Sequence, residues 1–492
     1  MDDLEQLLAF AEKALQESNY EASRKAFAKY LEVRPTDERA LICAAEVSRQ
    51  FNDTSHVCEI YAKAVGLEPN NLNLRAEWIE TLFADQQTEV AVTSAQEASA
   101  RHPDFLRFKL QIAQAEVING NFDVARRIFW ECHAEDPQHL APLSQLSQNA
   151  TAEDMDHLAP VLDALWQKRQ TLSPGDQITL AYARARVTEK LKRYEEAWES
   201  YALGAATHRS ISRYNELSTQ KNLQMHQQLF DRQSPIHRIT QNKSLGSNLI
   251  FIVSLPRAGS TLVEQILASH PMVDAIGERS FAFEAFNLWY DDPRLKPSNR
   301  FEEGAFEAAR TQYMNSATET AFGKGPFIID KSITNFLYVG FLHTLFPGAR
   351  FVHVVRNPLD VAFSCFATPF FTGIEWSYEL GETGRMIRRY QKLMRQWMKQ
   401  WPDDILNASY EELIEDVETT TRRVLEFCNL EWDPACLDFH KTKRAVMTAS
   451  VVQVRQPIYQ TAKGRASHFE AHLGPLKLAL GRAANPDWYL KP

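Results

Sequence analysis

The stretch LIFIVSLPRAGST, residues 249–261, decides the fold of the second half of this chain. Its five apolar residues, 249–253, predict a strand that is buried on both faces of a parallel sheet. Residues 262–269 predict an amphipathic helix, so the loop between them leads from a strand into a helix N-terminus. Backbone N–H groups converge at such a loop, and the helix dipole adds partial positive charge. We therefore expect an anion site there, with Arg257 as its cation.

The order of residues in this loop differs from the phosphate loop of nucleotide triphosphatases. That motif places a lysine and then a serine or threonine after two glycines, so that the lysine reaches the phosphates and the hydroxyl holds magnesium. Here Arg257 precedes Gly259, and the loop has no lysine. The sequence therefore disfavours a kinase or a triphosphatase.

A second strand-to-helix junction lies about one hundred residues further on. Residues 350–355, RFVHVV, predict another buried strand. Arg356 follows it directly, Asn357 suits a helix N-cap and Pro358 suits the first helical position. Ser364 lies eight residues after Arg356, on the helix that leaves the strand. The alternative interpretation of this segment is a capped helix with a surface arginine.

The loop and this Arg…Ser pair together resemble the sulfotransferase family. The family loop that wraps the 5′-phosphate is usually Pro-Arg-Ser-Gly-Thr-Thr-Leu, and an Arg…Ser pair at this spacing holds the 3′-phosphate. The resemblance covers most of residues 249–476 and is closest to the branch with tyrosylprotein sulfotransferases and bacterial repeat-linked sulfotransferases. It implies a P-loop-like α/β domain with a central parallel sheet, and 3′-phosphoadenosine 5′-phosphosulfate (PAPS) as co-substrate without a metal. Ala258 departs from the family serine, which removes one hydrogen bond of about 1 kcal/mol.

The resemblance assigns roles to further residues of this chain. Glu278 matches the carboxylate that acts as general base toward an acceptor hydroxyl. Lys331 matches the lysine that steadies the sulfuryl group and the leaving oxygen, together with Arg257. The residues implied to hold PAPS are Arg257, Ala258, Gly259, Ser260, Thr261, Arg356, Ser364, Tyr410, Ser450, Arg455 and Lys463.

Each of these assignments has a structural alternative. Glu278 could be a capping or surface carboxylate, Lys331 could pair locally with Asp330, and Tyr410 could be a core residue. Other sulfotransferase branches use a histidine base, and this half contains His270, His343, His353 and His468. The first of these precedes a proline at the end of the loop helix, and His353 lies within a presumed buried strand. We therefore rank Glu278 ahead of the histidines as the base, with His353 as the next candidate.

The first half of the chain has a 34-residue period. Prolines stand at positions 35, 69, 103 and 137, each closing a stretch with helical character. Eight residues before them stand Phe27, Tyr61, Ala95 and Phe129, with small residues at other fixed offsets. The pattern resembles the tetratricopeptide repeat (TPR), an α-solenoid of helix pairs that bury their apolar stripes against one another. A further pair is expected around residues 180–205.

Composition sets the remaining limits. The 492 residues are 44% hydrophobic and 24% charged, which suits a folded protein of two or three domains. We predict a TPR-like domain over 1–215, a linker over 216–247 and the sulfotransferase domain over 248–492. The net charge of −9 argues against a nucleic-acid partner. The chain shows no membrane-spanning run, no signal-peptide layout and no metal-ligand cluster, and its six cysteines lack paired spacing. We expect a cytoplasmic protein with reduced thiols.

The sequence thus favours an enzyme that moves a sulfuryl group from PAPS to an acceptor hydroxyl. A peptide tyrosine, a glycan and a small-molecule hydroxyl all remain open as acceptors. One alternative is a TPR scaffold with a non-catalytic sulfotransferase-like domain, and another is a P-loop transferase such as a small-molecule kinase. The repeat array either binds a protein or peptide partner or supports the domain that follows it.

Overall fold

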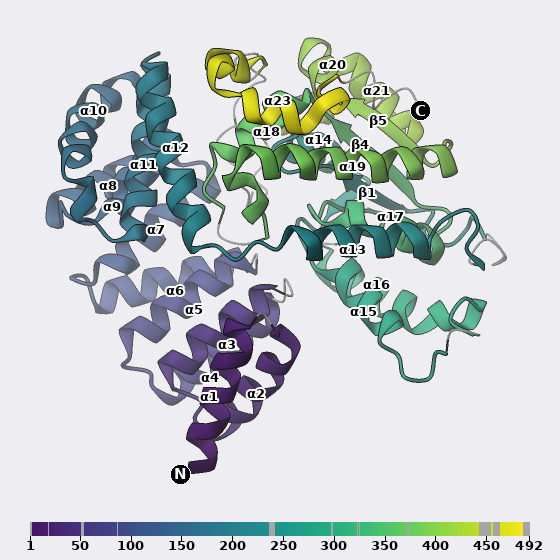
Figure 1. Ribbon diagram of the computed structural model, residues 1–492, viewed down its shortest axis with the longest axis horizontal. Helices are drawn as coiled ribbons and strands as arrows, with labels where there is room; N and C mark the ends of the chain where they lie inside the picture. The colour runs from purple at the N-terminus through teal and green to yellow at the C-terminus, as the bar shows by residue number, and fades with distance from the viewer. Residues whose placement is uncertain are drawn as a thin grey trace. The chain divides into compact units, whose positions relative to one another are not determined.

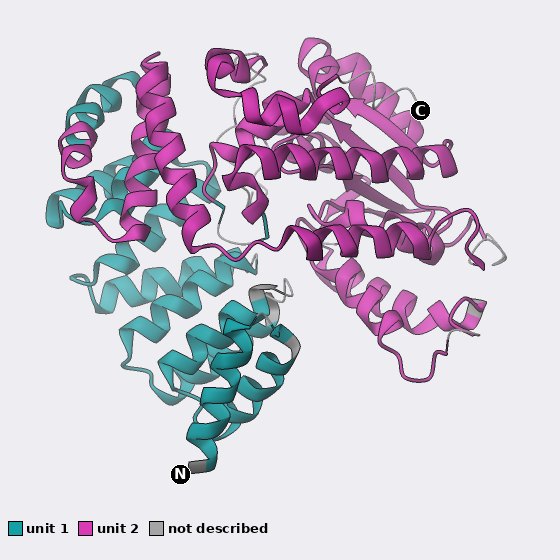
Figure 2. Cartoon of the chain, in the orientation of Figure 1, with its two compact units in different colours: residues 1–161, 370–374, 443–451 teal, residues 162–369, 375–442, 452–492 magenta. Residues whose placement is uncertain are grey.

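The computed structural model describes residues 2–17, 19–50, 54–85, 87–235, 242–296, 299–321, 323, 325–370, 373–441, 454–455 and 463–485. The chain forms two compact units. Figure 2 shows one that holds Met1–Val161 and another that holds Leu162–Pro369 and most of the chain beyond.

The first unit is a succession of packed helix pairs (Figure 1). It begins with α1 (Asp2–Gln16). The helices of one set start at residues 20, 54, 88 and 122: α2 (Tyr20–Val33), α4 (Thr54–Leu67), α6 (Thr88–Arg101) and α8 (Phe122–Glu135). Those of the other set alternate with them: α3 (Glu38–Gln50), α5 (Leu72–Ala84), α7 (Leu106–Asn119) and α9 (Leu140–Asn149). The 34-residue period and the helix-ending role of the prolines are confirmed, because each of α2, α4, α6 and α8 ends two residues before one of them.

The repeating positions form the core of this unit. Phe27, Tyr61, Ala95 and Phe129 are each at most 1% exposed. The small residues that precede them by four positions, Ser23, Val57, Ala91 and Ala125, are buried as well. A large side chain next to a small one lets neighbouring helices approach closely, so each pair covers the apolar stripe of the next. The predicted packing pattern is therefore confirmed.

A further helix pair belongs by its packing to the second unit. After α10 (Ala152–Gln167) and η1 (Arg169–Thr171) come α11 (Pro174–Lys190) and α12 (Tyr194–Ile211), which pack on each other as predicted. The Tyr182 hydroxyl donates to the carbonyl of Phe366 at 3.1 Å, and Trp198 stacks on His472 with ring centroids 4.5 Å apart. This pair is therefore part of the same compact body as the sheet. The domain boundary at residue 215 stays a prediction.

The segment predicted to be a linker contains a helix. α13 (Glu216–Leu229) packs on two helices of the same unit, α17 (Asn335–Leu345) and α19 (Leu380–Gln400). The Glu216 carboxylate accepts from Arg385 at 2.7 Å, and Gln227 exchanges amide contacts with Gln396. Its side chains are mostly polar, which is why the apolar period fades in the sequence although the helix continues.

The second unit contains a five-stranded sheet in the order β2-β3-β1-β4-β5, with every neighbouring pair parallel. The strands are β1 (Leu249–Val253), β2 (Val273–Ala275), β3 (Phe327–Asp330), β4 (Arg350–Val355) and β5 (Ile405–Ser409). All five residues of β1 are buried. The predicted buried strands at 249–253 and 350–355, and the parallel sheet itself, are confirmed.

Helices cover both faces of this sheet (Figure 1). The other elements of the unit are α14 (Ser260–Ala268), α15 (Phe281–Tyr290), η3 (Glu303–Phe306), α16 (Glu307–Thr320), α18 (Pro358–Phe366), η4 (Glu375–Tyr378), α20 (Tyr410–Glu415), α21 (Val417–Phe427), η5 (Pro434–Lys441), η6 (Arg465–His472), α23 (Gly474–Leu480) and η7 (Gly481–Ala484). Ile250 and Ile252 pack with apolar residues of α14 and α21. Phe251 points the other way, toward Tyr313 of α16 and Phe346 after α17. Alternate residues of a strand face opposite sides, which explains the continuous apolar run.

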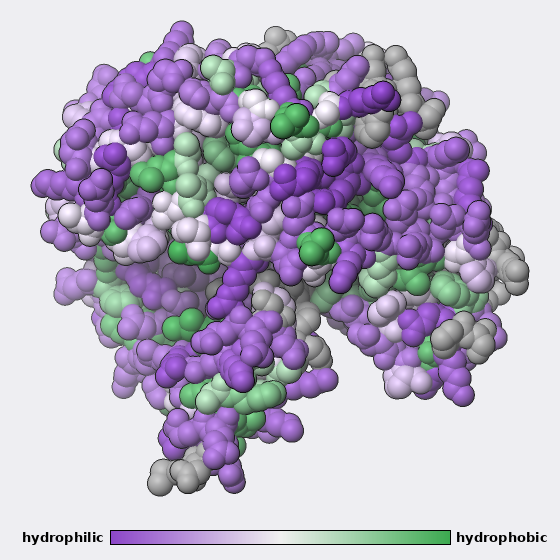
Figure 3. Space-filling model, viewed as in Figure 1, coloured by the Kyte–Doolittle hydropathy of each residue, from purple (hydrophilic) through white to green (hydrophobic). Residues whose placement is uncertain are grey.

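No helix among the described residues is long and apolar enough to cross a membrane. Within the same residues, no group of three or more His, Cys, Asp or Glu side chains is placed to hold a metal ion. All six cysteines are free thiols, as predicted. Figure 3 shows a mostly hydrophilic face with scattered hydrophobic residues.

An ion pair fastens α11 to the C-terminal part of the second unit. The Glu189 carboxylate accepts from Arg465 at 2.5 and 2.7 Å and from the Tyr201 hydroxyl at 2.8 Å. Both charged side chains are mostly buried, with 15% of Glu189 and 25% of Arg465 exposed. Burial alone would raise the pKa of Glu189, but the Arg465 guanidinium holds that pKa below its usual range. The pair is therefore ionised at neutral pH.

We predict that Glu189→Ala destabilises the second unit by about 3 kcal/mol, because it leaves the Arg465 guanidinium mostly buried without its carboxylate. Urea denaturation followed by circular dichroism measures the change. Glu195→Gln is the control: it removes a carboxylate that contacts His472 but is 83% exposed, and it should change the free energy of unfolding by less than about 0.5 kcal/mol. Equal effects of the two substitutions would contradict the prediction.

Candidate active site at the carboxyl edge of the sheet

The residues singled out by the sequence follow the carboxyl ends of the strands. Arg257 comes after β1, Glu278 after β2, Lys331 directly after β3, Arg356 directly after β4 and Tyr410 directly after β5. Because the strands are all parallel, these ends meet at one edge of the sheet. Ligands of open α/β sheets bind outside this edge, where the strand order reverses. The reversal here is at β1, which lies between β3 and β4.

The loop after β1 has an unusual backbone. Gly259 has φ +107°, and a Cβ built on it would lie 2.5 Å from Cδ2 of Tyr410. A side chain is therefore excluded both by conformation and by the approach of the ring. Arg257 also has a positive φ, +65°, which is uncommon for a residue with a Cβ and is frequent where a loop clamps a ligand. α14 begins at Ser260, as the predicted helix N-terminus required.

Ala258, which with Ser260 is one of two loop residues that depart from the family pattern, lines a small cavity. Ala258 is 2% exposed, and the cavity of about 20 Å³ is also lined by apolar side chains and by three polar ones: Val354, Val361, Ile387, Arg356, Tyr390 and Gln391. Nothing larger than a single water fits there.

The two arginines belong to one chain of contacts. Arg257 Nε donates to Ser364 Oγ at 3.1 Å, and Arg356 Nη1 donates to the Arg257 carbonyl at 3.0 Å. The Arg356 guanidinium lies over the ring of Tyr410, 4.5 Å from its centroid. Burial raises the pKa of Tyr410, so the ring stays neutral. The structure therefore brings these four predicted residues together from three strand ends.

The helix after β4 starts as the sequence predicted. Asn357 Oδ1 accepts from the backbone N–H groups of Leu359 and Asp360, and Pro358 is the first helical residue. One residue here was missed: Asp360 is 4% exposed and accepts from the N–H groups of Gly464 and Ala466 at 2.8 and 2.9 Å. The sequence offered no signal for it beyond an acidic residue in a first helical turn.

Glu278 and Lys331 meet beside the loop. The Lys331 ammonium contacts Glu278 Oε1, and the Lys331 backbone N–H donates to the carbonyl of Gly277 at 3.2 Å. The lysine side chain is 1% exposed, whereas 32% of the Glu278 side chain is accessible. Asp330 is engaged elsewhere, because its carboxylate accepts from Tyr313 and Asn335 at 2.7 and 2.8 Å.

A second carboxylate approaches the same lysine. Glu264 Oε2 of α14 lies 3.5 Å from Lys331 Nζ, and its side chain is 3% exposed. This residue was not among those predicted from the sequence. Its signal was a lone charge in a nine-residue helix that is otherwise apolar or uncharged, STLVEQILA. Such a charge is buried only when it has a partner.

The residues expected in the late loop are only partly described. Ser450 lies outside the described residues. Arg455 is half-buried next to the buried Val454. The Lys463 ammonium contacts Glu415 at the end of α20, while the next residue, Gly464, binds Asp360 at the start of α18. The backbone of the late turn therefore lies against the helix that carries Ser364.

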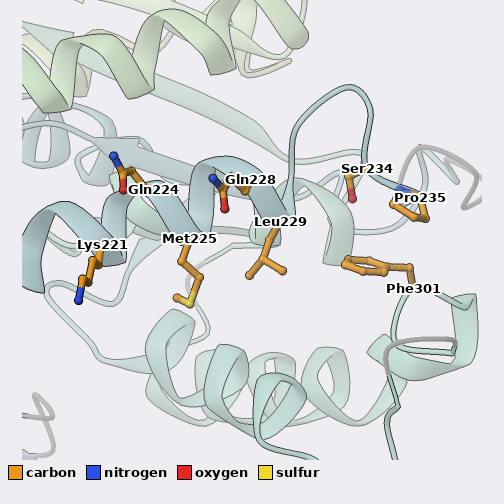
Figure 4. A pocket seen from close by; sticks show the side chains of 8 residues that line it. All are labelled: Lys221, Gln224, Met225, Gln228, Leu229, Ser234, Pro235 and Phe301. Carbon is orange, nitrogen blue, oxygen red and sulfur yellow. The ribbon is translucent and has the colours of Figure 1, made fainter.

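A surface pocket of about 400 Å³ is found elsewhere in this unit (Figure 4). It is lined by α13 and by residues near it in space: Lys221, Gln224, Met225, Gln228, Leu229, Ser234, Pro235 and Phe301. None of the predicted site residues lines it. Its walls carry one cation, so it offers little to a doubly phosphorylated ligand.

This geometry agrees with a comparison with known families. Residues 249–434 match the model of the sulfotransferase family. This region is similar to the sulfotransferase family. The match begins at the first residue of β1 and includes all five strands.

Two relatives match parts of the chain that are longer than this region. An uncharacterized protein of Aquifex aeolicus is 28% identical over 393 residues, which are 77% of this chain and 51% of that protein. A protein-tyrosine sulfotransferase of Drosophila melanogaster is 24% identical over 314 residues, covering 56% of this chain and 60% of that one. The chain spans about half the length of the Aquifex protein it matches.

Among solved structures, the sulfotransferase domain of the Synechococcus PCC 7002 olefin synthase is similar. It is 19% identical, with a TM-score of 0.36, over 51% of this chain and 99% of that one.

The histidines considered as alternative bases have structural partners. His353 is fully buried, with Nδ1 2.7 Å from Asn407 Oδ1 and Nε2 2.8 Å from the Tyr390 hydroxyl. His270, which follows α14, hydrogen-bonds the carbonyl of Glu431 and accepts from the backbone N–H of Met272. His343 contacts Asp404, and His468 stacks on the ring of Tyr194. The interpretation of His353 as a core residue is confirmed.

Burial lowers the pKa of His353 to about 4. Between about pH 6.5 and pH 4 the unfolded chain therefore binds a proton at this residue that the folded chain does not, so stability falls as the pH is lowered. We predict that His353→Gln destabilises the domain at pH 7, and that its deficit against wild type shrinks by up to about 3 kcal/mol by pH 4. Urea denaturation at several pH values measures this, and a deficit that does not change with pH would contradict it.

Proposed function

We propose that this chain transfers a sulfuryl group from PAPS to an acceptor hydroxyl. The observation that carries the proposal is the meeting of two arginines, a hydroxyl-rich helix N-terminus and the Glu278–Lys331 pair at one edge of the sheet. A doubly phosphorylated nucleotide needs two cationic sites. Sulfuryl transfer, like phosphoryl transfer, also needs a base beside them for the acceptor hydroxyl. The family match to residues 249–434 supports the same chemistry.

The donor fits the residues that are present. The N–H groups at the start of α14, with the hydroxyls of Ser260 and Thr261, would hold its 5′-phosphosulfate end. Arg356 and Ser364 would hold the 3′-phosphate, with the arginine forking onto two oxygens. Tyr410, which already carries the Arg356 guanidinium on its ring, would lie against the adenosine. The turn at Lys463 would close over the 3′-phosphate, as would Ser450 and Arg455.

The residues at this edge account for the bonds, the proton and the charge in the transfer step. The acceptor oxygen forms a bond to sulfur while the bond between sulfur and the bridging phosphate oxygen breaks, and adenosine 3′,5′-bisphosphate leaves. The proton of the acceptor hydroxyl passes to the carboxylate of Glu278, the more accessible member of its pair. The Lys331 ammonium and Arg257 stabilise the negative charge that develops on the leaving oxygen.

We propose only chemical classes for the acceptor and for the partner of the repeat array. A peptide tyrosine, a glycan hydroxyl and a small-molecule hydroxyl all fit a carboxylate base. The helix pairs of the first unit are proposed to bind a protein or peptide, and a cytoplasmic site of action is proposed from the free cysteines.

We predict that adenosine 3′,5′-bisphosphate binds the wild-type protein in calorimetry. Arg257→Ala and Arg356→Ala should each weaken binding by about 10- to 100-fold, because each removes a charge-assisted phosphate contact. Arg422→Ala is the control, since that arginine contacts Glu418 on the exposed side of α21. No binding by the wild type would refute the proposal, and tight magnesium-dependent ATP binding instead would favour a kinase.

We predict that Glu278→Gln lowers sulfuryl transfer by about 100- to 10,000-fold while nucleotide binding is kept, because only the proton acceptor is lost. Transfer of labelled sulfate from PAPS onto peptide, glycan and phenol libraries measures the rate. Asp292→Asn, which alters a surface pair with Arg294, serves as control. Undiminished transfer by Glu278→Gln would move the base to another residue.

A further inference from the structure

Lys331 lies between two carboxylates that come from different elements. Glu278 reaches its ammonium from the segment after β2, and Glu264 reaches it from α14 at 3.5 Å. The two differ in access to solvent, because 32% of the Glu278 side chain is exposed and only 3% of Glu264. One carboxylate can therefore meet a substrate, while the other is fixed inside the protein.

Glu264 is a costly residue for a mere packing role. It lies one turn after Ser260, on the inner side of a helix whose neighbours Val263, Ile266 and Leu267 belong to the apolar core. Replacing a buried ion pair by well-packed apolar residues is often neutral or stabilising. A carboxylate at this position is thus better explained by what it does to the lysine.

Asp330, the carboxylate next to Lys331 in the sequence, has its own partners. Asp330 precedes the lysine and accepts from Tyr313 of α16, from Asn335 and from the backbone N–H of Ser332. Burial raises the pKa of Asp330, and the charge of Glu264 adds to this rise. Among the described residues, both Glu264 and Glu278 lie in ion-pair contact with the ammonium.

In the proposed transfer, the carboxylate of Glu278 changes its charge and that of Glu264 does not. When Glu278 takes the acceptor proton it becomes neutral, and its attraction for the ammonium is largely lost. The ammonium must nevertheless stay protonated and in place to stabilise the leaving oxygen as that oxygen becomes negative. We infer that Glu264 is a positioning residue that keeps the Lys331 ammonium charged and in place while Glu278 carries the proton. This inference rests on the proposed function.

The test is the charge-only substitution Glu264→Gln in the full-length protein. We expect kcat to fall by about 10- to 100-fold while KM for PAPS stays within about threefold, because the lysine acts on the leaving group more than on binding. Without the neighbouring negative charge the ammonium loses its proton more easily. The alkaline limb of the kcat profile should therefore move down by about one pH unit or more.

Two further variants separate positioning from stability. Glu264→Asp keeps the charge at a shorter reach, so its alkaline limb should lie closer to that of wild type. Asp404→Asn removes another largely buried carboxylate, one that contacts Lys243 and His343. It should lower the melting temperature without moving the alkaline limb. A purely structural role for Glu264 would make Glu264→Gln behave like Asp404→Asn.

The outcomes distinguish this inference from the proposed function. If the wild type transfers no sulfuryl group and binds no adenosine 3′,5′-bisphosphate, the proposed function fails. If the wild type is active and Glu264→Gln keeps its kcat and its alkaline limb, only the inference is overturned. If Glu264→Gln does not fold by circular dichroism, Glu264→Asp decides. A lower kcat at an unchanged melting temperature supports the inference, and an unchanged kcat overturns it.

Discussion

The parallel alignment of five strands is the constraint on which the site depends. Parallel pairing sends every strand end to the same edge, so that residues up to 153 positions apart, from Arg257 to Tyr410, become neighbours. The strands contribute mostly apolar side chains and backbone hydrogen bonds, and buried polar residues such as Asp330 and His353 have partners inside the fold. Most candidate site residues belong to the residue or short loop that follows a strand, and Glu264 and Ser364 belong to the helices that begin there.

The contacts across this edge hold the candidate site residues in fixed positions relative to one another. Tyr410 packs on the bare Cα of Gly259 and beneath the Arg356 guanidinium, and Arg356 in turn holds the carbonyl of Arg257. Three strand ends are thereby fixed relative to one another before any substrate arrives. Prior fixing of donors at the position where charge develops is what makes electrostatic stabilisation effective in enzymes.

Local patterns in the sequence predicted much of this arrangement. The runs at 249–253 and 350–355 could be identified because a strand buried on both faces is apolar at most of its positions, and the prolines marked the helix ends in each repeat. The resemblance paired Ser364 with Arg356, and the contact of Arg257 with Ser364 was not predicted, since 107 residues separate the two. Glu264 and Asp360 were missed because their partners, a lysine and two backbone N–H groups, are brought to them only by the tertiary fold. The helical nature of α13 was missed because its polar face hides the period.

The packing of α11 and α12 has a consequence for how such proteins are assembled from modules. By sequence this pair continues the repeat pattern. Its residues Tyr182, Glu189 and Trp198, however, contact residues from the part of the second unit that contains the sheet. A repeat array can be lengthened, shortened or exchanged only where its inner face meets another repeat. Recombination that joins a new array at residue 215 would replace part of the core of the second unit. A junction before residue 162 would leave that core whole, so the interchangeable part of this chain is shorter than its repeats suggest.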